Sequence, residues 1–128
     1  MIDFCMQTDN LLAEITMFQR AGIDMSEPIP LSRVRPDGYE LSWLVSVHPG
    51  RYQGVVPFLI EDKTRRDERV PRENKHRNQV TGISSLTIAV DDVATICRWY
   101  SSILQADESE INCKELDAAG SALRDRAA

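Results

Sequence analysis

The segment that most constrains the fold of this chain runs from residue 82 to residue 93, with the sequence Gly-Ile-Ser-Ser-Leu-Thr-Ile-Ala-Val-Asp-Asp-Val. Apolar side chains alternate there with small or hydroxyl side chains, which predicts a β-strand over residues 82–90. The acidic pair Asp91 and Asp92 then predicts a helix start, because a carboxylate accepts hydrogen bonds from the first free backbone amides and complements the helix dipole. The segment therefore predicts a strand that leads directly into a capped helix.

The helix that follows this strand has an apolar stripe with spacings of three and four residues, which is typical of an amphipathic helix. Its members are Val93, Ile96, Cys97, Tyr100, Ile103 and Leu104. After Gln105 the chain becomes acidic. We expect a short helix from Glu115 to about Arg126 and no further strand.

The N-terminal residues carry a fainter copy of the same strand-to-helix unit. A shift of 82 positions, from Met6 to Ile88, brings the apolar positions of the two helices into the same phase. Residues 2–7 alternate as a strand, Asp9 is the predicted N-cap of the first helix, and Gly22 is predicted to follow its end. Because both units keep the same phase, we interpret them as a duplicated supersecondary unit.

The residues between the two units predict three extended segments. Residues 29–35 and 40–47 are expected to form a hairpin, since residues 36–38, Pro-Asp-Gly, are a strong turn signal. A further strand is predicted over residues 55–62, where Pro57 favours an edge position or a bulge. The first half of the chain therefore predicts the element order βαβββ.

The sequence divides into three parts. Residues 1–62 are predicted to form the βαβββ module, and residues 63–79 a charged linker. Residues 80–128 are predicted to form a partial second module, with one strand, one helix and an acidic tail. The charges of the linker have mixed signs, whereas a phosphate-binding patch would carry an excess of Lys and Arg. We therefore interpret residues 63–79 as a solvated connector.

Composition limits the classes of function. A net charge of -5 argues against general nucleic-acid binding, because phosphate binding needs a basic surface. No apolar run approaches the roughly 20 residues that span a bilayer, and the N-terminus lacks the basic region of a secretory signal. Cys5, Cys97 and Cys113 are widely spaced, so we expect three free, buried thiols. The sequence thus predicts a cytoplasmic protein with no nucleic-acid or membrane partner.

In combination, these segments resemble the vicinal oxygen chelate superfamily, and more narrowly its glyoxalase-like domain proteins. The resemblance spans about residues 3–104 and rests on residues 5–11, 21–23, 32–43, 57–62, 78–83, 90–93 and 99–100. It implies an α+β fold in which βαβββ modules of glyoxalase-like type build a curled mixed sheet around a cavity. This chain would supply one module and the β-α start of a second. The resemblance therefore places a further module before Met1 and more strands after Ala128.

The resemblance also implies a chemistry. Metal-dependent members take ligands from a His on the first strand of a module and a Glu on its last, and the metal acts as a Lewis acid. The first-strand positions fall on Ser85 and, through the repeat, on Asp3, whereas the last-strand position falls on Phe58. Glu61 has the opposite strand parity and is expected to face away from the cavity. No metal site and no cofactor is therefore predicted, and a divalent metal would need ligands from outside this chain.

The remaining reactive side chains predict no catalytic site. His48 is expected at a strand end and His76 in the charged linker, both as solvated loop residues. The sequence lacks a GxSxG elbow, a Walker loop and an HExxH motif. Cys5 faces the expected cavity, but no histidine is predicted near it. We therefore interpret Cys5 as a buried, inert thiol.

The candidate site is a cavity lined by side chains from several strands. Its candidate lining residues are Asp3, Cys5, Trp43, Phe58, Ser85 and Thr87. Arg33 and Arg35, before the hairpin turn, are candidates to bind a substrate carboxylate, because a guanidinium binds a carboxylate in a bidentate manner. The alternatives are that both arginines are solvated and that Trp43 and Phe58 belong to the core.

These observations favour a glyoxalase-like protein that binds a small organic ligand in a sheet-lined cavity. A second hypothesis is a metal-dependent lyase, isomerase or dioxygenase whose ligands come from a missing module or a partner chain. A third is a truncated structural remnant whose incomplete second sheet leaves an unpaired edge that serves for dimerisation. A homodimer is accordingly the expected protein partner.

Overall fold

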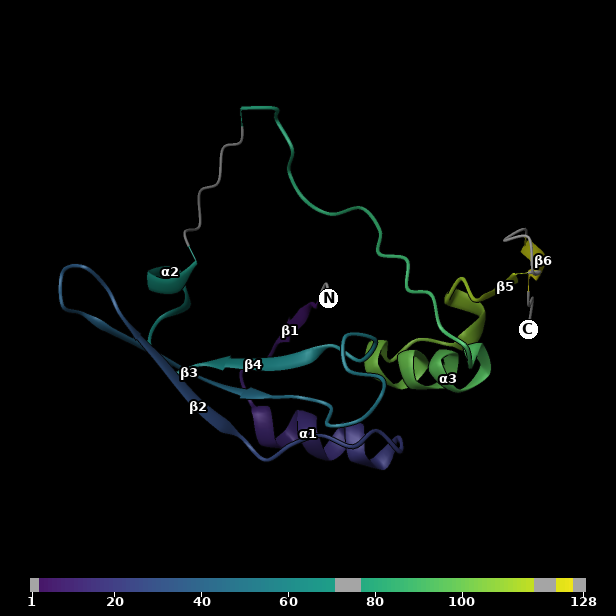
Figure 1. Ribbon diagram of the computed structural model, residues 1–128, viewed down its shortest axis with the longest axis horizontal. Coiled ribbons are helices and arrows are strands. Elements are labelled where there is room, and N and C mark those ends of the chain that lie inside the picture. The colour runs from purple at the N-terminus through teal and green to yellow at the C-terminus, as the bar shows by residue number, and fades with distance from the viewer. Residues whose placement is uncertain (1–2, 71–76, 117–121, 126–128) are drawn as a thin grey trace.

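The computed structural model describes residues 3–70, 77–116 and 122–125, and its fold is α+β, as predicted (Figure 1). Four strands form one mixed sheet in the order β1-β4-β3-β2. The elements of this sheet and of the helix before β2 are β1 (Cys5–Gln7), α1 (Leu11–Arg20), β2 (Ile29–Val34), β3 (Glu40–Ser46) and β4 (Phe58–Asp62). β1 and β4 are parallel, whereas β3 is antiparallel to both of its neighbours. The predicted βαβββ order is therefore confirmed, and the sheet is open.

α1 forms where its apolar stripe and its caps predict it. Its buried residues are Leu11, Ile15 and Phe18, which share one side because of their spacing. The N-cap is Asn10 instead of the predicted Asp9, and the Asn10 side chain accepts a hydrogen bond from a first-turn backbone amide at 3.1 Å. Gly22 follows the helix with a φ of 81°, the left-handed conformation predicted for a residue at this position.

β2 and β3 form the predicted hairpin. The backbone amide of Arg35 donates to the carbonyl of Tyr39 at 2.8 Å, and Gly38 in the turn has a φ of 85°, which residues with a Cβ rarely adopt. Every residue of β2 is exposed, because β2 is the edge strand beside β3. β4 begins directly after Pro57, so the proline precedes the strand and removes no hydrogen bond from its ladder.

The sheet has one face packed against α1 and one face turned away from it. Met6 pairs with Leu59, and both pack with α1 in the core. The buried members of this core are Leu11, Ile15, Phe18, Ile23, Met25, Val56, Leu59 and Ile103. α2 (Arg66–Arg69) lies on the opposite side of the sheet from α1 (Figure 1). We call this opposite side the open face.

α3 (Val93–Leu104) is the predicted second helix, and its start repeats that of α1. Its first residue lies 82 positions after Leu11, as the repeat requires. The Asp92 side chain accepts a hydrogen bond from the amide of Thr95 at 3.1 Å, which matches the cap of α1. Ile103 of α3 joins the core beneath α1. α3 therefore packs on the same core as α1.

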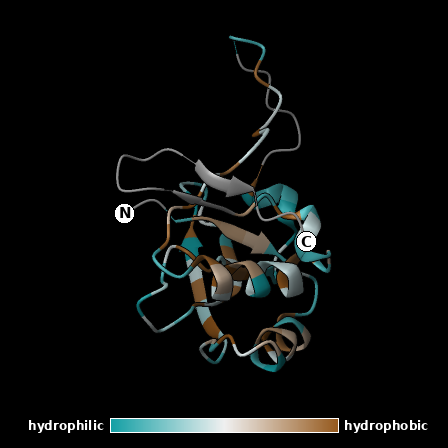
Figure 2. Cartoon of the chain, turned by 90° about the vertical axis from the view of Figure 1, so that its right-hand side faces the viewer, coloured by the Kyte–Doolittle hydropathy of each residue, from teal (hydrophilic) through white to brown (hydrophobic). Residues whose placement is uncertain are grey.

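The strand predicted over residues 82–90 is not formed. Residues 81–90 have no regular secondary structure, and this part of the chain runs away from the body of the molecule (Figure 1, Figure 2). Its apolar side chains lie in solvent, with Ile83 91% and Leu86 57% exposed. A strand requires a neighbour for its backbone donors and acceptors, and no strand of the described residues pairs with this segment. The alternating sequence alone does not supply that neighbour.

The helix expected from Glu115 to about Arg126 is also wrong. Its described residues lie in β5 (Lys114–Leu116) and β6 (Ala122–Asp125), which pair in antiparallel fashion. A 3-10 helix, η1 (Glu108–Glu110), precedes them. Helix propensity is a weak local preference, and here it is overridden by pairing between two segments that are close in sequence.

The first part of the predicted linker folds back onto the sheet. The backbone amides of Lys63 and Thr64 both donate to the carbonyl of Ser42, at 3.0 and 3.1 Å. The Ser42 amide in turn donates to the Thr64 hydroxyl at 3.1 Å. Residues 63–70 are therefore attached to β3, while the predicted division into residues 1–62, 63–79 and 80–128 stays a prediction. His76 lies outside the described residues.

Candidate functional site

The open face brings together side chains from neighbouring strands. Cys5 on β1 pairs with Phe58 on β4, and Asp62, further along β4, pairs with Trp43 on β3. Residues that pair directly, and residues two or four apart on one strand, lie on the same face. Cys5, Phe58 and Trp43 therefore share the open face. Phe58 and Trp43 are half-buried, whereas Cys5 is exposed and free, so the prediction that Cys5 is buried is wrong.

β2 adds a cation to this face. Leu31 pairs with Trp43, and Arg33, two residues along β2, pairs with Leu41. Arg33 is exposed. Within the described residues its guanidinium makes no hydrogen bond or ion pair. Arg33 is thus free to bind an anion beside Trp43.

Arg35 is occupied by contacts within its own turn. Its Nη2 lies 2.7 Å from Oδ2 of Asp37, and its guanidinium carbon lies 5.8 Å from the centre of the Tyr39 ring. Both interactions would have to be given up for Arg35 to bind a ligand. Of the two arginines predicted to bind a carboxylate, Arg33 is therefore the better placed.

α2 is attached to one end of the open face by a partly buried ion pair. Arg69 Nε and Nη2 donate to the two carboxylate oxygens of Asp62 at 2.5 and 2.9 Å. The Asp62 side chain is only 6% exposed. The Arg69 guanidinium lies 5.8 Å from the centre of the Trp43 ring, and the bond to Asp62 raises the pKa of Arg69. This pair could not be predicted, because charged residues in a linker give no sign that one of them returns to the sheet.

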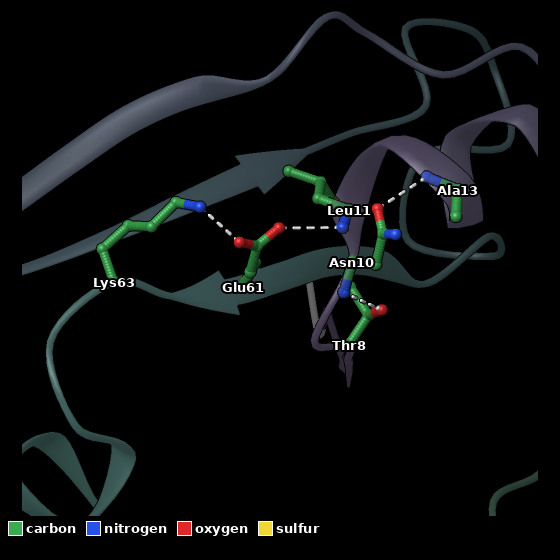
Figure 3. Close-up of polar contacts among 6 residues, drawn as sticks. All are labelled: Thr8, Asn10, Leu11, Ala13, Glu61 and Lys63. Atoms are coloured by element: carbon green, nitrogen blue, oxygen red, sulfur yellow. Dashed lines mark hydrogen bonds and ion pairs between the residues drawn. The ribbon is translucent and has the colours of Figure 1, made fainter.

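Glu61 lies on the α1 side of the sheet, as its strand parity predicts (Figure 3). Its Oε2 accepts a hydrogen bond from the backbone amide of Leu11 at 2.8 Å, and Lys63 binds its Oε1. The Lys63 ammonium and the Leu11 amide hold the pKa of Glu61 below its ordinary value. Glu61 therefore caps α1 and does not reach the open face.

The positions that the family resemblance assigns to metal ligands do not fit a divalent metal. Phe58 has no donor atom, and Ser85 lies in the unpaired segment. Asp3 is exposed, and its Oδ1 accepts a hydrogen bond from the neighbouring amide of Phe4 at 2.8 Å. Among the described residues, no three His, Cys, Asp or Glu side chains group closely enough to hold a metal ion.

Not all predicted lining residues reach the open face. Ser85 and Thr87 are exposed in the segment that has no strand neighbour. Asp3 precedes β1. The structure thus brings Cys5, Trp43 and Phe58 together and leaves the other three apart.

His48 is buried instead of solvated. It is 7% exposed, and its Nδ1 lies 2.7 Å from the carbonyl oxygen of Asp24. The centre of its ring lies 6.0 Å from that of Trp99 on α3, and Trp99 meets Tyr52 edge-on at 5.3 Å. His48 therefore helps to dock α3, which the sequence did not indicate because its partners are distant along the chain.

Two of the three cysteines are joined, against the prediction of three free thiols. Cys97 on α3 and Cys113 form a disulfide, with their Cα atoms 6.4 Å apart. The spacing of the cysteines along the chain does not show which of them meet in the fold. The turn after α3 brings Cys113 back to the helix, so the two residues become neighbours.

Comparison with known proteins identifies the family. The family model of the glyoxalase-like domain matches residues 1–104, which include the whole sheet, α1 and α3. Searches of curated proteins and of solved structures gave no match. No helix in the described part of the chain is long and apolar enough to cross a membrane. Since the family match covers most of its length, the chain belongs to the glyoxalase-like domain family.

Proposed function

We propose that this protein binds a small organic acid on the open face of its sheet. The apolar body of the ligand would lie against Phe58 and Trp43, and its carboxylate would bind Arg33. The observation that carries the proposal is the position of an unpaired guanidinium on the same face as two half-buried aromatic side chains.

The dimensions of the face support a ligand of one or two rings. Trp43 pairs with Asp62, four residues from Phe58 on β4, which corresponds to about 13 Å at the usual rise of a strand. Arg33 lies diagonally across from Trp43, at roughly 7 to 8 Å between backbones, within reach of its long side chain. Aromatic surface and one charged group are the usual composition of a small-molecule site.

The function proposed for the open face is the binding of a ligand. The Asp62 carboxylate is neutralised by Arg69, so the face offers a carboxylate ligand no strong repulsion near Trp43. Cys5 is the nucleophile placed on the face, and no histidine of the described residues lies on the same strands. The proposal therefore assigns Arg33 to orientation and Trp43 and Phe58 to apolar contact.

Titration with 2-naphthoate, an aromatic carboxylate, tests the proposal. Amide and indole chemical shifts of the full chain would be followed by NMR, and the expected changes centre on Cys5, Trp43 and Phe58. Arg33→Met should weaken binding about tenfold, since loss of a charge-assisted hydrogen bond costs about 1.4 kcal/mol or more. Arg20→Met, which removes an exposed cation from α1 on the other side of the sheet, is the matched control and should bind as the wild type does.

Two results would reject the proposal. One is a set of shift changes confined to residues outside the open face. The other is equal weakening by Arg33→Met and Arg20→Met, which would indicate only general charge attraction. Trp43→Leu adds a third check, because it keeps the position apolar while it removes the ring and should weaken binding of the aromatic probe.

We further infer that residues 83–90 pair with a second copy of the chain. This inference is supported by the strand-like alternation of the segment, by its exposed Ile83 and Leu86 and by the unpaired outer edges of β1 and β2. Leu86→Asp should convert a dimer into a monomer in sizing chromatography, whereas Thr81→Asp, two residues before the pairing segment, should not. A wild-type protein that stays monomeric at all concentrations would reject the inference.

A cytoplasmic location remains a proposal, which cell fractionation tests.

A further inference from the structure

We propose that Cys97 and Cys113 form a redox-controlled tether, which fixes the segment after α3 to that helix when oxidised and releases it when reduced. The two residues are 16 positions apart in sequence, with a Cα separation of 6.4 Å, within the range that a disulfide spans. The third cysteine, Cys5, lies on β1 and is free. The proposal does not depend on ligand binding at the open face.

The tether acts on a segment that has few hydrogen bonds to α3. Ala106 is held directly, since its amide donates to the Ser101 carbonyl at 3.0 Å and its carbonyl accepts from the Ser101 hydroxyl at 2.5 Å. From residue 107 to residue 113 the described hydrogen bonds are local, within a capping box and the turns of η1. The Cys97–Cys113 bond therefore attaches the far end of this segment to α3.

The two cysteines differ in exposure, and this difference determines which thiol reacts first. Cys97 is 7% exposed on the apolar stripe of α3, whereas Cys113 is half-buried in the following segment. A small-molecule disulfide such as oxidised glutathione therefore reaches Cys113 first. The Cys113 thiolate attacks one sulfur, which forms a mixed disulfide and releases one small thiol.

Closure follows when the Cys97 thiolate attacks the Cys113 sulfur. The Cys97–Cys113 bond forms, and the second small thiol leaves. Each protein thiol has lost one proton, and the two electrons have reduced the small-molecule disulfide to two thiols. A reducing environment keeps such a pair open until the redox balance shifts.

Mass spectrometry of the full chain in glutathione buffers tests the chemistry. After quenching and alkylation, the oxidised wild type should retain one alkylatable thiol in denaturant and the reduced protein three. Cys97→Ser should accumulate glutathione on Cys113, because the thiol that resolves the mixed disulfide is gone. Cys113→Ser should leave Cys97 unmodified in the folded protein, and Cys5→Ser should still close the bridge.

Proteolysis and hydrogen exchange test the tether itself. Glutamyl endopeptidase can cut after Glu108 and Glu110, inside the closed loop, so the fragments that contain Cys97 and Cys113 should stay joined in the oxidised protein and separate only after reduction. Amide exchange over residues 107–113 should slow about fivefold or more in the oxidised protein, because the bridge suppresses local opening. The same exchange rates in Cys113→Ser should not respond to oxidised glutathione.

Several results would overturn the proposal. Three alkylatable thiols after incubation with oxidised glutathione would show that the pair does not close, and a bridge to Cys5 would show a different pairing. Equal exchange rates in both redox states would show that the disulfide bond forms but does not hold residues 107–113 in place. If Cys97→Ser fails to fold because its position is buried, Cys97→Ala provides the same readout with an apolar side chain.

Discussion

Glu61 on β4 accepts a hydrogen bond from the backbone amide of Leu11 at 2.8 Å, which joins the last strand of the first module to the start of α1 (Figure 3). The first amides of a helix lack partners within the helix, and a negative charge there complements the helix dipole. Asn10 satisfies another of these amides. The N-terminus of α1 is therefore fixed by one local residue and one residue 50 positions away.

Glu61→Gln should lower the free energy of unfolding by about 1 to 2 kcal/mol at pH 7. The folded pKa of Glu61 lies below its ordinary value of 4.5, with the Lys63 ammonium and the Leu11 amide as causes. The contribution of the carboxylate is therefore complete above pH 4.5 and is lost as the pH falls through the folded pKa. Chemical denaturation at several pH values should show a smaller loss of stability in acid for the variant than for the wild type.

Glu27→Gln is the matched control for this experiment, because the Glu27 carboxylate is exposed and makes no described contact. It should change the unfolding free energy by less than about 0.5 kcal/mol. If both variants lose the same stability, the link between Glu61 and α1 contributes nothing.

Gly50→Ala should destabilise the protein by about 1 to 3 kcal/mol through overpacking. A Cβ at residue 50 would lie 2.8 Å from Nε2 of His48. The His48 ring cannot move away freely, because Nδ1 is bonded to the Asp24 carbonyl and the ring packs near Trp99. Thermal unfolding of the variant measures the effect.

Two further variants isolate this contact. Gly82→Ala is the control, since a Cβ there meets nothing within 4 Å, and it should have little effect on stability. In a His48→Ala background the cost of Gly50→Ala should disappear. A cost that persists without the imidazole ring would assign the effect to the backbone instead.

The pair Asp62–Arg69 should show a coupling energy of about 1 to 2 kcal/mol in a double-mutant cycle with Asp62→Asn and Arg69→Met. Its carboxylate is nearly buried and accepts two hydrogen bonds. The exposed pair Arg35–Asp37, whose side chains are 40% and 54% exposed, is the comparison and should couple by less than about 0.5 kcal/mol. Equal coupling in the two pairs would mean that burial does not strengthen the bond of α2 to the sheet.

Tyr100→Phe should cost about 1 kcal/mol of stability, because the Tyr100 hydroxyl donates to the Val55 carbonyl at 2.5 Å. Burial raises the pKa of Tyr100 above its ordinary value of 10.0. The wild type should therefore lose stability as the pH rises above about 10, since the unfolded state ionises first. The variant should lose less over this range.

Ultraviolet difference spectroscopy follows the ionisation directly. Tyr100 should ionise only as the protein unfolds. Tyr39→Phe, which removes an exposed hydroxyl bonded to Glu68, should leave this late step in place. If the Tyr100→Phe variant still shows the late ionisation step, that step belongs to another tyrosine.

The parts of the fold that local chemistry controls could be predicted from the sequence. α1 and α3 start 82 residues apart with equivalent side-chain caps, because capping involves residues within one turn of each other. Strand periodicity likewise placed Cys5 and Phe58 on one face and Glu61 on the other. The hairpin at residues 36–38 also forms as expected, since a turn depends on its own residues.

Partners that are distant along the chain explain several features that could not be predicted. Residues 82–90 alternate as a strand does, yet no described strand pairs with them. His48 looked like a loop residue but contacts the Asp24 carbonyl and Trp99. Arg69 looked like part of a linker but returns to Asp62.

The sequence by itself determined α1 and α3, the βαβββ order and the side of each strand to which a residue belongs. Only the tertiary structure decided that Arg33 shares a face with Trp43, that Arg69 lies near the Trp43 ring and that Cys97 meets Cys113. The physical reason is the separation along the chain over which each interaction acts. Capping and periodicity act over a few residues, whereas strand register, ion pairing and disulfide formation join residues whose separation along the chain is set by the whole fold.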